Sequence, residues 1–191
     1  LPGTSATYLT GIMHDDVVSQ YEDFLGSMGF HAGVIETSSL SLLNLWGPLV
    51  VKDLRPESDY FFLNLEESYF TVSLVRDRDT PVLVRTLGQR LPAADGEGGG
   101  RYPMEELVGE IVPTLIFYRE KLRGGSLARV YYRSLRSDLE PLQEMLEEQF
   151  EVPAERFDLH RAVAIGKDLA VEEPLASVAG AAAGAAYGKA A

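Results

Sequence analysis

Acidic side chains are the most numerous groups in this sequence that could do chemistry, with 29 Asp and Glu against 17 Lys and Arg. Two-metal hydrolysis needs three or four carboxylates that converge on the ions. Glu106, Glu110 and Asp138 are instead spread over predicted helices and a helix cap, where a solvated helix face explains them. We therefore assign no catalytic residue and expect no metal ligand.

Other reactive groups are few. The absence of cysteine excludes disulfides, thiolate metal sites and a cysteine nucleophile, and it fits a reducing compartment. His14, His31 and His160 have no metal-ligand spacing. Residues 88–102 contain Gly98-Gly99-Gly100 and are predicted to form a flexible loop. A phosphate-cradling loop is the alternative, but no strand leads directly into the glycines and neither common nucleotide motif is present.

The elements that would position any site are organised around residues 59–87. Three segments there are rich in β-branched and aromatic residues and are separated by polar turns, which predicts a three-stranded meander. The strands are predicted at Tyr60–Leu65, Tyr69–Arg76 and Val82–Leu87. Alternation in the second strand places Phe70, Val72 and Leu74 toward a core.

Helices and strands alternate on both sides of this meander. The elements predicted before it are a strand at Tyr8–Met13, a helix after His14 that ends near Gly29, a strand at Phe30–Glu36 and a helix from Ser38 or Ser39 that ends at Gly47-Pro48. The elements predicted after it are a helix over 103–122 kinked at Pro113, a strand at Leu127–Tyr132, a helix after Ser137 that reaches Phe150, a weak strand at Arg156–His160 and an Ala/Gly-rich tail over 175–191, helical or disordered.

Composition limits the partners that we expect. The chain has 191 residues, is 46% hydrophobic and carries a net charge of −12 with a pI near 4.7. Such a chain repels nucleic-acid backbones and anionic membrane surfaces. It also contains no run of about 20 strongly apolar residues, so we expect no membrane span.

The order β-β-β-α-β-α-β-α over 57–191 resembles the ribonuclease H-like half-domain of the actin-like superfamily, an α/β fold with a mixed sheet. The β-α-β-α order over 1–50 resembles the last part of a preceding half. The resemblance implies two subdomains, 1–50 and 57–191. The leading part of the first half would be absent from this sequence.

Within that superfamily, four stretches resemble PilM, the cytoplasmic actin-like family of type IV pilus assembly, in a divergent form. They are Val17–Glu36, Thr37–Leu45, Phe61–Leu87 and Val112–Leu122, although Pro113 is unexpected in the last. Each stretch is generic alone, and only their order is specific.

The resemblance also implies where ATP would bind, and the residues there match poorly. The phosphate-loop position is occupied by Asn64, Glu66, Glu67 and Ser68, without the glycine that lets backbone N–H groups approach phosphate. Two carboxylates there would repel a triphosphate. The adenosine-loop position contains Ser134 and Leu135 in place of paired glycines. We therefore predict no cofactor, with ATP and Mg²⁺ as the alternative.

The implied function is a non-catalytic scaffold of a type IV pilus or related secretion platform. It would be cytoplasmic, at the inner-membrane face, and would bind the cytoplasmic tail of a membrane protein; oligomers are compatible with this function. The alternatives are an actin-like ATPase, which would need a glycine-rich first hairpin, and a soluble α/β domain of unknown function. A ribonuclease H-like nuclease would need an acid where the first strand has Asn64.

Overall fold

The computed structural model describes residues 12–31, 35–66, 69–88, 104–134 and 141–162, together with residue 182. The chain divides into two compact units, residues 1–37 and 38–191. The first unit contains α1 (Asp15–Ser27), which begins with two acids in its first turn and buries none of its residues. The strands predicted on either side of α1 lie partly outside the described residues.

The second unit is built on a five-stranded mixed sheet with the order β3-β2-β1-β4-β5. The central strand β1 (Asp59–Leu65) pairs antiparallel with β2 (Tyr69–Arg76), and β2 pairs antiparallel with β3 (Thr80–Gly88). On its other side, β1 pairs in parallel with β4 (Leu127–Ser134), which pairs in parallel with β5 (Ala154–Arg156). The meander predicted from the sequence is confirmed.

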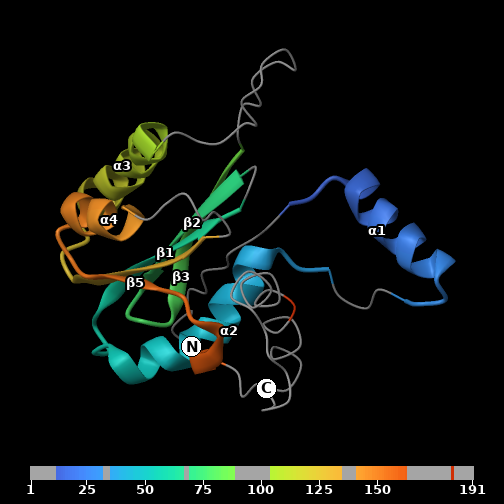
Figure 1. Ribbon diagram of the computed structural model, residues 1–191, viewed down its shortest axis with the longest axis horizontal. Helices are drawn as coiled ribbons and strands as arrows, with labels where there is room; N and C mark the ends of the chain where they lie inside the picture. Colours follow the sequence, from blue (N-terminus) through green and yellow to red (C-terminus); the bar gives the residue numbers. More distant parts are fainter. Residues whose placement is uncertain are drawn as a thin grey trace, which may run out of the picture. The chain divides into compact units, whose positions relative to one another are not determined.

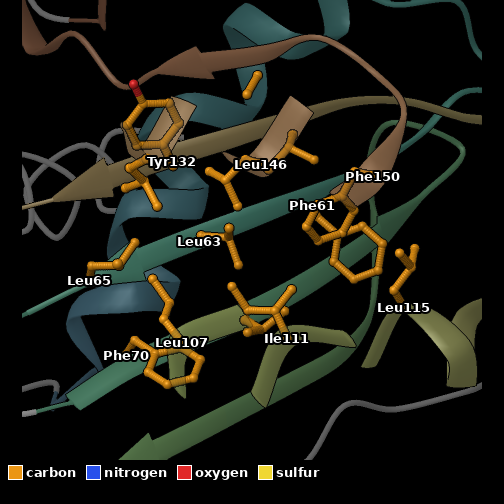
Figure 2. Packing of buried hydrophobic residues seen from close by; sticks show 14 of the residues in the cluster. Phe61, Leu63, Leu65, Phe70, Leu107, Ile111, Leu115, Tyr132, Leu146 and Phe150 are labelled. Atoms are coloured by element: carbon orange, nitrogen blue, oxygen red, sulfur yellow. The ribbon is translucent and has the colours of Figure 1, made fainter. Parts of the chain in front are cut away.

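Helices cover both faces of this sheet (Figure 1). On one face, α3 (Met104–Glu120) and α4 (Leu142–Phe150) pack on the odd-numbered side chains of β1. Figure 2 shows Phe61 and Leu63 of β1 beside Ile111 of α3 and Phe150 of α4. Each of these side chains is nearly fully buried, which stabilises the fold by about 1.5–3 kcal/mol per side chain.

The opposite face of the sheet is covered by α2 (Ser38–Asp53) and α5 (Leu159–Ala162). Leu42 and Trp46 of α2 pack against Tyr60, Phe62 and Tyr131 of the sheet. Because both faces are covered, the second strand buries Thr71 and Ser73 as well as its apolar residues. Alternation alone had placed only one side of that strand in a core.

The clearest differences from the predicted element boundaries are in two elements. The second helix does not end at Gly47-Pro48: α2 continues through Pro48 to Asp53, because Val50 is fully buried and its packing outweighs the backbone bond that proline removes. The last strand lies at Ala154–Arg156, two residues earlier than predicted, and a short helix occupies Leu159–Ala162. The tail over 175–191 and the loop over 89–103 lie outside the described residues, except residue 182.

Candidate functional site

The two predicted nucleotide-loop positions lie at the same edge of the sheet. The parallel pairing of β1 with β4 places Asn64 opposite Arg133 and Leu65 opposite Ser134, at the carboxyl end of both strands. The hairpin that follows β1 is tight, since the Glu66 amide donates to the Tyr69 carbonyl at 2.9 Å. Glu67, Ser68 and Leu135 belong to the same predicted positions but lie outside the described residues.

A buried guanidinium joins these two positions. Arg133 Nη1 donates to Asn64 Oδ1 and to Glu66 Oε1, both at 2.6 Å. Asn64 Nδ2 in turn donates to Ser39 Oγ at 3.1 Å and to Glu66 Oε1 at 3.3 Å. We call Ser39, Asn64, Glu66 and Arg133 the Arg133 cluster. It ties the first hairpin, the end of β4 and the start of α2 together.

The Arg133 cluster is buried and internally charge-balanced. Asn64 is 0% exposed and Arg133 is 2% exposed, while the Glu66 side chain is 15% exposed. A charge taken out of water needs a close opposite charge and further hydrogen bonds, and the Glu66 carboxylate and the Asn64 amide supply both. A triphosphate that approached this guanidinium would have to displace Glu66 from it.

The carboxylates considered for metal chemistry do not converge. Glu110 lies on α3 and pairs with Arg85 at 3.5 Å, on the sheet face opposite the one that Asn64 faces. The side chain of Glu106 and all of Asp138 lie outside the described residues. Within the described ranges, no group of three acidic or histidine side chains could hold a metal ion.

Two of the three histidines belong to the first compact unit. His14 is exposed and precedes α1 without a side-chain capping hydrogen bond, and His31 is exposed. The side chain of His160 lies outside the described residues.

Sequence reasoning found Asn64 and Glu66 but missed Arg133 and Ser39 as their partners. Arg133 directly precedes the predicted adenosine-loop position of Ser134 and Leu135. One signal was available: Asn64 and Arg133 are polar residues near the carboxyl ends of two largely apolar strands. The predicted strand ended at Tyr132, however, so aligning the predicted strand ends would have paired Asn64 with Tyr131 instead of Arg133. No comparable signal pointed to Ser39, because its contact depends on how α2 packs.

Three meandering strands followed by alternating helices and strands agree with the ribonuclease H-like half-domain order that the sequence predicts. The particular fold is that of PilM. The chain is similar to the solved structure of the PilM–PilN type IV pilus biogenesis complex, with a TM-score of 0.69 and 18% identity over 88% of this chain. It spans 58% of the length of that solved chain.

Other solved structures are matched more weakly. An exopolyphosphatase from Cytophaga hutchinsonii gives a TM-score of 0.34 at 15% identity, covering 55% of this chain and 35% of its own. A Ppx/GppA family member from Aquifex aeolicus gives a TM-score of 0.31 at 16% identity, covering 52% and 35%. No protein-family model and no curated protein matches the chain. None of the described helices combines the length and the apolar character that crossing a membrane requires.

Proposed function

We propose that this chain is a non-catalytic, actin-like scaffold of a type IV pilus or related secretion platform. It would act in the cytoplasm, at the inner-membrane face, and bind the cytoplasmic tail of a membrane protein. The PilM-like fold supports the pilus assignment. The observation that carries the non-catalytic assignment is the Arg133 cluster, because an internal ion pair spans the two positions where the resemblance would put a nucleotide.

The physical argument rests on what ATP would have to replace. The Arg133 guanidinium is already neutralised by Glu66 at 2.6 Å, and charge-assisted bonds of this kind are among the strongest in proteins. The hairpin residues Asn64 to Ser68 contain no glycine to bring backbone N–H groups toward a phosphate. Binding of a nucleotide would break this ion pair of the protein, and the phosphates would gain few new hydrogen-bond donors in return.

Titration with fluorescent ATP in the presence of Mg²⁺ tests the non-catalytic assignment. We expect no saturable binding at micromolar concentrations, because the donor that would meet the phosphates is already engaged. Saturable micromolar binding that Arg133→Ala abolishes would contradict the assignment. The Arg85→Ala variant, at a half-buried arginine, serves as a control for the loss of one positive charge.

The pilus assignment needs a separate test. Synthetic peptides that correspond to the cytoplasmic tails of inner-membrane proteins encoded beside this gene are titrated against the chain by calorimetry. Saturable binding of a pilus-protein tail is the expected result. If neither a membrane-protein tail nor a purified pilus protein binds, the scaffold assignment is wrong, whatever the nucleotide experiment shows.

A further inference from the structure

A groove runs between α3 and α4 on the outer side of the helical layer, and the two helices lie side by side in Figure 1. The groove is shallow and open to solvent, and it encloses no space for a water molecule. Seven of its eight lining residues are apolar, and the set is Val108, Ile111, Val112, Leu115, Met145, Leu146, Gln149 and Phe150. Ile111, Leu115 and Leu146 form its floor, because they are buried in the core below.

One wall of the groove is an apolar row that the core does not use. Val108 and Val112 are half-buried, and Ile116 continues the row at the same four-residue spacing with 47% of its surface exposed. Residues four apart lie one above the other on a helix, so these three side chains form a continuous ridge. Met145 and Gln149, also four apart, form the opposite wall on α4.

The α4 side of the groove is acidic. Glu144 and Glu148 are exposed and precede Met145 and Gln149 by one residue each. Neither carboxylate has a hydrogen bond or an ion pair with the residues that the structure describes, and α4 contains no Lys or Arg. Arg119, in the last turn of α3, forms an ion pair with Glu151 at 3.5 Å. Among the residues of α3 and α4 whose side chains the structure describes, the unpaired charge beside the groove is therefore negative.

We propose that this groove binds a basic amphipathic helix of another protein. Side chains four residues apart form ridges on a helix, and a third helix can pack its own ridge into the groove between two such ridges. Apolar side chains of the partner would lie along Val112 and Ile116, and its Lys or Arg residues would face Glu144 and Glu148. The row from Val108 to Ile116 spans about 12 Å, which is roughly two helical turns. The inference does not depend on the proposed pilus function.

The charge of the chain argues against a second copy as the occupant. Its exposed amphipathic helix, α1, presents Tyr21 and Phe24 at 58% and 61% exposure, so it has the apolar stripe that a groove would accept. Its other side is acidic, however, with Asp15, Asp16, Glu22 and Asp23. If α1 of a second copy lay in the groove, its acidic side chains would come close to Glu144 and Glu148, and the like charges would repel one another.

The test uses three labelled synthetic peptides and the complete chain. The first is a helix of roughly four turns with Leu on one side and Lys on the other; the second replaces each Lys with Glu; the third has the composition of the first in an order without an apolar stripe. Binding is followed by fluorescence anisotropy. We expect the Lys peptide to bind at least about tenfold more tightly than either of the others.

Adjacent residues of α3 supply a matched pair of variants. Ile116 and Phe117 are 47% and 41% exposed, but Phe117 lies about 100° further around the helix, away from the row of Val108 and Val112. Ile116→Glu should lower the affinity for the Lys peptide at least about tenfold, whereas Phe117→Glu should change that affinity by less than about twofold. Circular dichroism confirms that both variants keep their fold.

Charge reversal supplies the second pair. Glu144→Lys combined with Glu148→Lys should lower the affinity for the Lys peptide and raise the affinity for the Glu peptide. The same change in net charge on α1, Glu22→Lys with Asp23→Lys, should do neither. Equal effects of the paired variants, equal affinity for the three peptides, or no saturable binding of the Lys peptide would overturn the proposal. So would a dimer in sedimentation that Ile116→Glu dissociates, because the groove would then hold a second copy.

Discussion

At the scale of single residues, the Arg133 guanidinium of the candidate site is almost completely buried from solvent. Removing one member of a buried ion pair is far more costly than the pair itself is favourable, because the other charge stays behind without a partner. Arg133 and the Glu66 carboxylate form such a buried ion pair, with side chains only 3% and 15% exposed. The cluster should therefore respond to mutation as one unit.

Arg133→Ala and Glu66→Ala should each lower the free energy of unfolding by about 3–5 kcal/mol, because each removes one half of a buried ion pair whose other half stays in the protein. The double variant should lose clearly less free energy of unfolding than the two single variants lose in sum. Urea denaturation of the four proteins measures this coupling.

A second ion pair provides the control. Arg85 and Glu110 are 3.5 Å apart with side chains 39% and 42% exposed, so Arg85→Ala should change the free energy of unfolding by no more than about 1 kcal/mol. If Arg133→Ala were as mild as Arg85→Ala, the Arg133 cluster would not hold the hairpin to β4.

At the scale of elements, the sequence predicted what local pattern determines. The three strands of the meander were placed within two residues of their observed ends, because each is a run of β-branched and aromatic residues between polar turns. Where packing overrides local preference, prediction failed. Gly47-Pro48 is a strong stop signal, yet α2 passes through it because Trp46 and Val50 on either side are buried.

Very short elements carry too little pattern to be located. β5 has three residues, and its position is set by pairing with Val130 to Tyr132 of β4 rather than by its own sequence. The candidate site shows the same division. Asn64 and Glu66 were found in a local turn, whereas their contact with Arg133 joins residues 69 and 67 positions apart.

The turn from α3 into β4 permits a sharp prediction about two neighbouring glycines. A Cβ on Gly124 would lie 2.0 Å from Cε2 of Tyr118, whereas a Cβ on Gly125 would meet nothing within 4 Å. The Tyr118 ring has little freedom to move, because it is buried and its hydroxyl donates to Asp59 Oδ2 at 2.8 Å. Burial and this bond raise the pKa of Tyr118 to about 12.

Gly124→Ala should therefore lower the free energy of unfolding by about 1–3 kcal/mol, since the ring or the turn must shift. Gly125→Ala should stay within about 0.5 kcal/mol. Thermal unfolding of both variants measures the difference. Equal stabilities would mean that Tyr118 moves freely, contrary to its bond with Asp59.

At the scale of the whole molecule, the main question is whether α2 belongs to the first or to the second of the two subdomains. The boundary between subdomains was predicted after residue 50, which would assign α2 to the first of them. The structure groups α2 with the sheet, and the compact units divide between Thr37 and Ser38. Leu42, Trp46 and Val50 are almost fully buried and belong to the same apolar cluster as Tyr60 and Phe62 of the sheet.

Two truncations separate these assignments. Removing residues 1–37 should shift the unfolding temperature by no more than about 4 °C, because α1 buries none of its residues. Removing residues 1–50 should abolish cooperative unfolding. The buried side chains of α2 that pack on the sheet contribute about 2 kcal/mol each, and their sum approaches the whole stability of a domain. Calorimetry of 38–191 and 51–191 beside the complete chain makes the comparison. If 51–191 unfolded as cooperatively as 38–191, α2 would not belong to the core of the sheet, and the boundary after residue 50 would be the better one.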